Sequence, residues 1–140
     1  MKVAIVVSRF NELITKELTL GAEEVFKAAG LGFDVYWVPG AHEIPVTLQW
    51  LARSKRYQGL LALGCVIKGD THHFEVVVDA VNQGTLRVSL DESLPIATGV
   101  LTTYTLEQAM ERIGGKVGHK GKESASALIE MLELRNSLTL

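Results

Sequence analysis

The chain has 140 residues, and its 14 lysines and arginines against 16 aspartates and glutamates give a formal net charge of −2. This balance, with an aromatic content of only 6%, argues against a dedicated nucleic-acid-binding protein. The hydrophobic content of 47% is high for a small soluble protein and indicates surface that is buried against other copies of the chain. We expect a single domain over residues 1–140, long enough to bury about two thirds of its unfolded surface.

The sequence shows no signal for export or membrane insertion. The amino terminus enters a short apolar run at residues 3–7 without the architecture of a signal peptide, and no apolar stretch reaches the ~20 residues of a membrane helix. The single cysteine, Cys65, excludes an internal disulfide and fits a reducing compartment. We therefore expect a cytoplasmic protein that has no membrane partner.

The first half of the chain has the pattern of two strand–helix units. A buried strand at residues 3–7 precedes a helix that Asn11 and Gly30 bound. A second strand at residues 33–38 leads into a helix with Pro45 in its first turn, where the missing N–H is harmless. The apolar positions of the first helix are Ile14, Leu18, Ala22, Val25, Phe26 and Ala29.

The third unit contains a polar turn between two apolar segments. Residues 59–66 form a continuous apolar run, as in strands that are buried on both faces of a parallel sheet. Residues 68–71 break this run, and apolar residues then recur at helical spacing from Phe74 toward Leu90. The turn therefore joins the carboxyl end of a strand to the amino end of a helix, where free N–H groups and the helix dipole attract anions.

The last part of the chain predicts a strand at residues 94–102 and a short helix at 105–113, in which Thr105 and Gln108 have capping-box spacing. Between residues 112 and 122 four glycines and several cations occur without an acid. Such a loop is either a solvated surface or an anion-binding site. A final helix from Lys122 has its apolar positions at Ala125, Ala127, Leu128, Met131, Leu132 and Leu134.

This order of elements, without repeats or linkers, predicts an α/β fold. We expect a three-layer α/β/α sandwich around a four-stranded parallel, flavodoxin-like sheet. The carboxyl ends of parallel strands share one edge, so Phe10, residues 40–43 and residues 68–73 should lie close together there. That edge is the predicted site.

Two adjacent histidines, His72 and His73, stand at this edge. Imidazole is well suited to proton transfer near neutral pH, but the same residues also suit a solvent-exposed helix start. Adjacent helical side chains point about 100° apart. Because no Cys or His lies at metal-ligand spacing either, no metal site is predicted.

Three other residues have two interpretations each. Phe10 suits either stacking on a planar ligand or a small core contact, and Glu43 suits either hydrogen bonding to a ligand or compensation of the helix dipole. Cys65 is interpreted as a small hydrophobic residue that closes a strand, since a nucleophilic thiol needs a base beside it.

Six segments form a pattern that is more specific than any single motif and that covers essentially the whole chain: residues 8–11, 39–45, 64–75, 99–102, 107–109 and 112–123. Together they resemble the 6,7-dimethyl-8-ribityllumazine synthase family. The resemblance implies a transferase that condenses 5-amino-6-(D-ribitylamino)uracil with 3,4-dihydroxy-2-butanone 4-phosphate, releasing phosphate and water in riboflavin biosynthesis. It implies neither a cofactor nor a metal.

The resemblance also implies roles for individual residues. His73 is the implied catalytic residue, which moves protons during Schiff-base formation and phosphate loss. The residues implied to hold the pyrimidine and ribityl groups are Phe10, Ala41, His42, Glu43, Cys65, Val66, Ile67 and Thr98. Those implied to bind phosphate are Asp70, Thr71, Arg112 and Lys120. The attacking amine belongs to the substrate, so no enzyme nucleophile is expected.

The resemblance further implies a homo-oligomer with sites between subunits, either a pentamer or a hollow icosahedral shell of sixty subunits. The residues implied to face a neighbour's Phe10, Glu43 and His73 are Thr98, Arg112 and Lys120. Family members carry an amino-terminal segment that adds a strand to a neighbour's sheet, whereas here the first strand begins at Lys2, so both assemblies stay open. The other implied partners are the small-molecule substrates, inorganic phosphate as product, and riboflavin synthase.

The chain departs from the family pattern at His42, Lys68, Thr98 and His119, where other residues are usual. None of these departures removes the implied proton-transferring imidazole or the phosphate partner. Two other function classes are alternatives: a flavin- or phosphate-binding module of the flavodoxin or receiver type, and a non-catalytic shell protein. A flavodoxin needs a hydroxyl- and glycine-rich loop after the first strand and a receiver needs an acidic cluster, and residues 8–11 supply neither.

Overall fold

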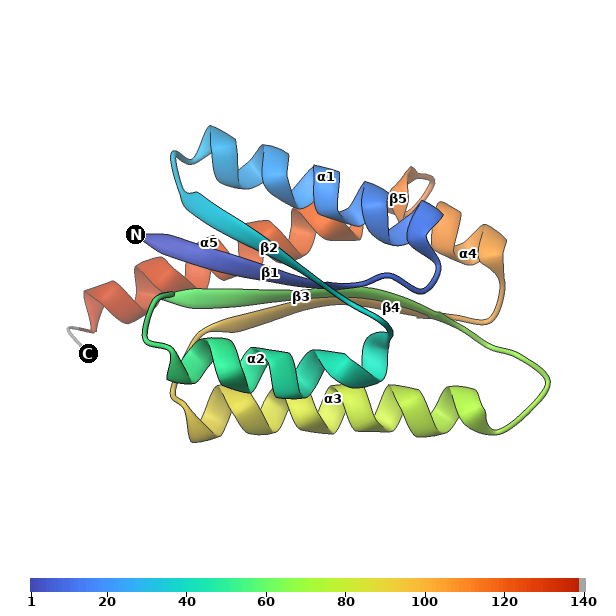
Figure 1. Ribbon diagram of the computed structural model, residues 1–140. Helices are drawn as coiled ribbons and strands as arrows, with labels where there is room; N and C mark the ends of the chain where they lie inside the picture. The colour runs from blue at the N-terminus through green and yellow to red at the C-terminus, as the bar shows by residue number, and fades with distance from the viewer. Residues whose placement is uncertain (139–140) are drawn as a thin grey trace.

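A computed structural model of the chain describes residues 1–138. Its main sheet has four parallel strands in the order β2-β1-β3-β4. The strands are β1 (Lys2–Ser8), β2 (Gly32–Val38), β3 (Gly59–Ile67) and β4 (Ile96–Thr103). Helices cover the sheet above and below, as Figure 1 shows. The predicted three-layer α/β/α fold is confirmed.

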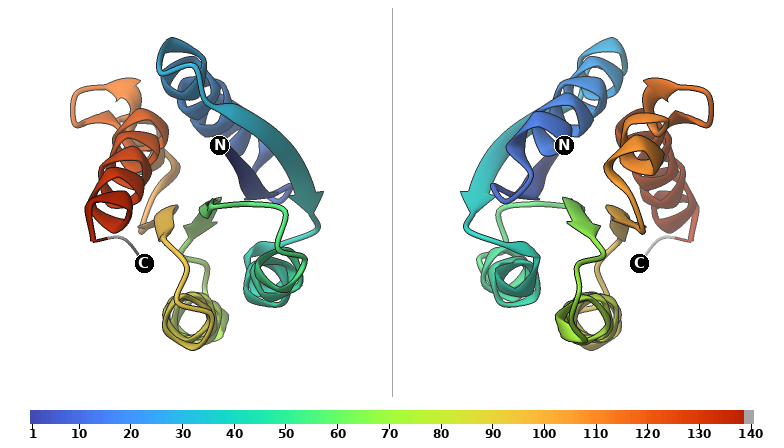
Figure 2. Two further views of the ribbon diagram at one scale, coloured as in Figure 1. Left: turned by 90° about the vertical axis from the view of Figure 1, so that its left-hand side faces the viewer. Right: turned by 90° about the vertical axis from the view of Figure 1, so that its right-hand side faces the viewer.

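Two pairs of long helices form the outer layers. Seen along the strands, α1 (Glu12–Ala28) and α5 (Lys120–Ser137) lie on one side of the sheet, and α2 (Ile44–Arg53) and α3 (His73–Asp91) on the other (Figure 2). The shorter elements are η1 (Ala41–Glu43), α4 (Leu106–Met110), β5 (Ile113–Gly115) and β6 (Gly118–His119). Within residues 1–138, every helix is too short or too polar to span a bilayer.

The central strands are apolar throughout because both of their faces are covered. Side chains alternate between the faces of a strand. On β1, Val3, Ile5 and Val7 belong to the core under α1 and α5, whereas Ala4 and Val6 belong to the core over α2 and α3. Strand β3 continues both cores, and residues 59–65 on it are all buried.

The chain reverses its direction across the sheet between β1 and β3. From β1 it moves outward to β2, returns past β1 to β3, and continues to β4. Ser8 pairs with Val38 at the ends of β1 and β2, so these two strands finish level with one another. In open α/β sheets the crevice at such a reversal is the usual ligand site.

The turn after β1 differs from the prediction. The side chain of Asn11 does not cap α1; its backbone is left-handed, with φ 62°, and its Nδ2 donates to the Cys65 carbonyl oxygen at 2.8 Å. Asparagine tolerates this backbone conformation because its short polar side chain hydrogen-bonds locally. At the other end of α1, Gly30 has φ 68°, as expected of a glycine that follows a helix.

The predicted loop at residues 112–122 contains structure that its sequence did not indicate. Strands β5 and β6 form a short antiparallel hairpin there, and α5 begins at Lys120 rather than Lys122. Gly114 and Gly118 supply the positive φ angles of the hairpin, 104° and 95°. Strands of three and two residues are too short to show an alternating pattern, and for this reason the hairpin was not predicted.

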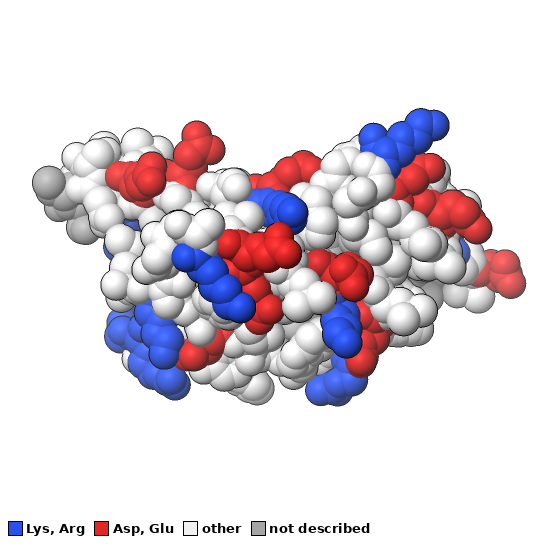
Figure 3. Space-filling model, turned by 90° about the horizontal axis from the view of Figure 1, so that it is seen from above, with Lys and Arg blue, Asp and Glu red and all other residues white. Residues whose placement is uncertain are grey.

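Several apolar residues that were assigned to buried helix faces are exposed. On α5, the packed stripe consists of Ala125, Leu128 and Leu132. The predicted positions that are exposed instead are Ala29, Ala127, Met131 and Leu134. The face covered by α1 and α5 also carries acidic and basic side chains side by side, with uncharged surface between them (Figure 3).

Candidate functional site

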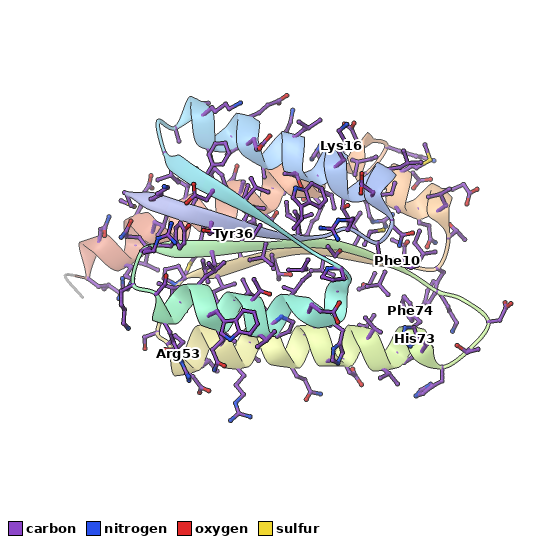
Figure 4. The ribbon with its side chains drawn as sticks, viewed as in Figure 1. Phe10, Lys16, Tyr36, Arg53, His73 and Phe74 are labelled. Atoms are coloured by element: carbon purple, nitrogen blue, oxygen red, sulfur yellow. The ribbon has the colours of Figure 1, made fainter. Side chains whose placement is uncertain are left out.

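A cavity of about 690 Å³ opens at the carboxyl edge of the sheet, where the chain reverses. The residues that line it come from the turn after β1, from η1, from the end of β3 and from the start of α3. Its lining residues are Phe10, Asn11, Gly40, Ala41, His42, Glu43, Cys65, Val66, Ile67, Gly69, Thr71, His73, Phe74, Val76 and Val77. Phe10, His73 and Phe74 lie together at this end of the molecule, whereas Arg53 lies toward the opposite end (Figure 4).

Phe10 presents an aromatic ring at the mouth of the cavity. The backbone hydrogen bonding of β1 to β2 continues past the strand ends, since Arg9 N donates to Val38 O at 2.7 Å and Phe10 N donates to Pro39 O at 3.1 Å. The backbone of Phe10 is therefore fixed, while 62% of the residue stays exposed. A large exposed aromatic side chain beside a cavity can stack on a planar ligand.

The end of β3 forms an apolar wall of the cavity through Cys65, Val66 and Ile67. Cys65 is only 3% exposed, and this burial raises the pKa of its thiol to about 11. The thiol is therefore protonated near neutral pH and is not a nucleophile. The interpretation of Cys65 as a small buried residue at a strand end agrees with its environment.

Glu43 has one structural hydrogen bond and one oxygen that is turned toward a histidine. Its Oε1 accepts from the backbone N–H of Gly40 at 2.8 Å, and its own backbone N–H donates to the Gly40 carbonyl oxygen at 3.2 Å. Its Oε2 lies 3.7 Å from Nδ1 of His42. Oε1 of Glu43 is thus engaged by the backbone at η1, and Glu43 also lines the cavity.

The two adjacent histidines occupy different surroundings. His73 is the first residue of α3 and lines the cavity together with Thr71, whose Oγ1 accepts from His73 N at 3.4 Å. The side chain of His72 is 81% exposed, lies 3.6 Å from Glu75 and is not part of the cavity wall. Over residues 1–138, no group of three or more potential metal ligands comes together.

Lys68 ties the turn before α3 to the neighbouring elements. Its Nζ lies 3.2 Å from Oε1 of Glu75 and 5.6 Å from the ring centre of Tyr104, and the Tyr104 ring lies 6.0 Å from that of Phe74. The pKa of Glu75 is held below its usual value. The first cause is a hydrogen bond that its carboxylate accepts from the backbone N–H of Glu75, and the second is the contact with Lys68. The Lys68 side chain therefore links the start of the turn to the first part of α3.

Four predicted site residues are not part of the cavity wall. Asp70 lies in the turn between Gly69 and Thr71, both of which line the cavity. Thr98 is exposed on the edge strand β4, where it pairs with Ala62. Arg112 and Lys120 lie where the β5–β6 hairpin meets α5. Arg112 Nη1 donates to Gln108 O at 2.7 Å, which ties its side chain to α4.

Four lining residues lie outside both the predicted edge segments and the implied site residues: Asn11, Phe74, Val76 and Val77. Gly40 and Gly69 belong to the segments 40–43 and 68–73 that were predicted at this edge. Asn11 had been assigned to a helix cap, and Phe74 and Val77 to the apolar face of a helix. Val76 could have been predicted as a site residue, because it is an apolar residue on α3 outside the periodic apolar stripe. An apolar residue at such a position is exposed, and here it lines the cavity.

The comparisons with known proteins agree with the pattern of segments. The family model described as 6,7-dimethyl-8-ribityllumazine synthase matches residues 1–136. Relatives with this name from Leuconostoc mesenteroides and Lactiplantibacillus plantarum are both 46% identical, over 95% and 99% of this chain and 87% and 89% of their own lengths. The resemblance is thereby confirmed. The chain belongs to the 6,7-dimethyl-8-ribityllumazine synthase family.

Proposed function

We propose that the chain condenses 5-amino-6-(D-ribitylamino)uracil with 3,4-dihydroxy-2-butanone 4-phosphate to 6,7-dimethyl-8-ribityllumazine, with release of phosphate and water, in riboflavin biosynthesis. Membership of the family supports this transferase activity. The observation that carries the proposal is the placement of His73, Phe10 and Glu43 around one cavity. A proton-transferring group, an aromatic platform and a hydrogen-bond acceptor are what such a condensation requires.

The cavity suits the pyrimidine substrate in its size and in the residues that form its walls. Its volume of about 690 Å³ lies within the usual range for small-molecule sites. Phe10 is proposed to stack on the pyrimidine ring against the apolar wall at residues 65–67. Ala41, His42 and Glu43 are proposed to hold the ribityl chain, with Glu43 Oε2 accepting from its hydroxyls.

The phosphate of the second substrate is assigned to the amino end of α3. Asp70 and Thr71 precede this helix, whose first N–H groups lack partners within it and attract anions. Arg112 and Lys120 would add positive charge, and a guanidinium can hold a phosphate through two hydrogen bonds. Within one chain these two residues stand outside the cavity wall, so the proposal takes them from a neighbouring subunit.

A homo-oligomer with sites between subunits is therefore part of the proposal, with a pentamer as its unit and a sixty-subunit shell as the larger alternative. Thr98 would face the same shared site. Exposed apolar side chains supply surface for such contacts; they include Val46 and Trp50 on α2 and Leu86 and Leu90 on α3, and Trp50 is 65% exposed. Because α2 and α3 lie next to each other on one side of the sheet, these exposed apolar side chains suit a protein interface.

His73 is proposed to transfer the protons of the reaction. The substrate amine attacks the ketone carbonyl, and loss of water from the adduct forms a C=N bond. The amine proton leaves and the carbonyl oxygen departs as water, so each step needs a group that accepts a proton and then returns it. A proton then leaves the carbon beside the C=N bond as the C–O bond to phosphate breaks, which gives an enol that tautomerises to a ketone. The ribityl-bearing nitrogen attacks this ketone, and loss of a second water closes the ring. Neither a cofactor nor a metal takes part in this scheme, and the cytoplasm is its proposed location.

The proposal is tested by mixing the purified protein with both substrates. Appearance of lumazine absorbance together with stoichiometric phosphate release is the expected result. Binding of a flavin without any product would instead favour a binding module, and assembly without either would favour a shell protein. Product transfer to riboflavin synthase is tested by adding that enzyme, and the mass of the native particle tests the assembly.

A further inference from the structure

His119 caps the amino end of α5 with its imidazole ring. Its Nδ1 accepts a hydrogen bond from the backbone N–H of Lys122 at 3.2 Å, and its own N–H donates to Oε2 of Glu123 at 3.1 Å. The pair of bonds resembles a capping box in which an imidazole replaces the usual hydroxyl. Only an imidazole nitrogen without a proton can accept, so this cap uses the tautomer that carries its proton on Nε2.

The ring of His119 is held in place by the close approach of α1. A Cβ at Gly21 would lie 2.2 Å from Cε1 and 2.7 Å from Nε2 of this ring. Beside it, a Cβ at Gly121 would lie 2.1 Å from the Leu18 carbonyl oxygen. The two glycines therefore let α1 and α5 approach closely, and the imidazole fills the space that remains beside Gly21.

The capped end of α5 also carries the two proposed phosphate-binding cations. His119 pairs with Ile113 across the β5–β6 hairpin, and the next residue, Lys120, donates its backbone N–H to the Arg112 carbonyl oxygen at 2.8 Å. The backbones of Arg112 and Lys120 are thus joined directly at the point where His119 begins the helix. A shift of the cap would move both residues.

We propose that His119 is a positioning residue for phosphate recognition: its cap on α5 and its contact with Gly21 hold Arg112 and Lys120 in their places. This inference rests on the proposed function, because it concerns the residues assigned to the substrate phosphate. His119 itself is not assigned a contact with substrate. Its effect passes through the backbone of the hairpin and the first turn of α5.

A matched pair of variants separates the cap from the bulk of the side chain. Asn and Leu have nearly the same shape, but only Asn offers an oxygen that can accept the Lys122 N–H. His119→Leu should raise KM for the phosphorylated ketone by up to roughly tenfold, the most that the energy of one cap can supply, and leave KM for the uracil substrate within about twofold. His119→Asn should stay within about threefold of the unaltered chain for both substrates.

Substitution on α1 provides a second test that leaves His119 in place. Gly21→Ala should raise KM for the phosphorylated ketone because its methyl group displaces the imidazole. The double variant Gly21→Ala, His119→Asn should recover in part, since Asn lacks the Cε1 and Nε2 atoms that the methyl meets, whereas its accepting oxygen takes the place of Nδ1, 2.8 Å from that methyl. Gly32→Ala is the control, because a Cβ there meets nothing closer than 3.7 Å.

Native particle size and circular dichroism verify that each variant is folded, and calorimetric titration with inorganic phosphate measures the site without turnover. If the unaltered chain forms no product, the proposed function fails, while the phosphate titration still tests His119. Equal phosphate affinity in the Leu variant, the Asn variant and the unaltered chain overturns the inference. So does a failure of the double variant to recover.

Discussion

The side-chain amide of Asn11 donates a hydrogen bond to the carbonyl oxygen of Cys65 at 2.8 Å. This bond joins the turn after β1 to the end of β3, across the position where the chain reverses its direction. Because Phe10 precedes Asn11, the bond also sets the distance between the aromatic side of the cavity and its apolar wall at residues 65–67. The site thus depends on a contact between the turn after β1 and the end of strand β3.

Substitution of Asn11 should therefore affect stability and the cavity together. Asn11→Gly keeps the left-handed backbone but loses the bond, at a cost of about 1 kcal/mol in the free energy of unfolding. Asn11→Asp should cost more, because a carboxylate would face the Cys65 carbonyl oxygen without a donor. Urea unfolding of both variants measures the difference. An Asp variant as stable as the original chain would show that the bond contributes nothing.

His73→Ala should reduce turnover by about 10²–10⁴-fold, the usual contribution of a positioned proton-transfer group. Binding of the uracil substrate should change much less, because His73 transfers protons and is not proposed to hold the ring. Single-turnover kinetics and equilibrium titration separate the two effects. His72→Ala is the matched control, since that side chain lies outside the cavity wall and should retain nearly full turnover.

Arg112→Ala should mainly impair use of the phosphorylated substrate. Hydrogen bonds to charged groups contribute about 1.5–3 kcal/mol, so KM for the ketone phosphate should rise roughly 10- to 100-fold. Affinity for the uracil substrate alone should be unchanged. Arg87→Ala is the control, because Arg87 is exposed on α3 and pairs with Asp91 at 3.3 Å. An equal loss of affinity for both substrates would contradict the assigned role of Arg112.

Cys65 should resist alkylation in the native protein. Its raised pKa of about 11 keeps the thiol protonated near neutral pH, and burial adds a steric barrier. Compared with an unperturbed thiol, the reactive thiolate should be depleted at least ~10²-fold. Iodoacetamide labelling followed by mass spectrometry, with and without denaturant, measures this ratio. Similar labelling rates in the two states would contradict the buried, protonated thiol.

Acid should destabilise the protein through Asp34. The hydroxyl of Tyr57 donates to Asp34 Oδ2 at 2.5 Å and Lys2 Nζ lies 3.1 Å from the same oxygen; first the Tyr57 bond and then Lys2 hold the pKa of Asp34 below its usual value of 3.8. A lowered folded-state pKa stabilises the protein above the ordinary value. This stabilisation disappears as the pH falls toward the lowered pKa.

Tyr57→Phe should therefore flatten the loss of unfolding free energy below about pH 4, as measured by urea unfolding at a series of pH values. Tyr36→Phe is the control, because the Tyr36 hydroxyl contacts that of Tyr57 and leaves the bond from Tyr57 to Asp34 in place. Identical acid dependence in the Tyr57 variant and the original chain would show that Asp34 does not couple folding to pH through this bond.

Much of the architecture follows from local patterns in the sequence. The uninterrupted apolar runs of β1 and β3 predict strands that are covered on both faces, and the structure shows those residues buried. Parallel strands bring their carboxyl ends to one edge, so Phe10, Glu43 and His73 could be placed near one another without coordinates. The resemblance of six segments indicated the family, and the comparisons with known proteins confirm it.

Other features were decided only when the chain packed. The bond from Asn11 to Cys65 and the contact of His119 with Gly21 join residues that are far apart in the sequence. Such contacts leave no periodic signal, because they depend on how the helices and turns approach one another. The same holds for α5. The sequence indicated its apolar positions, and packing against α1 and the sheet decided which of these positions are buried.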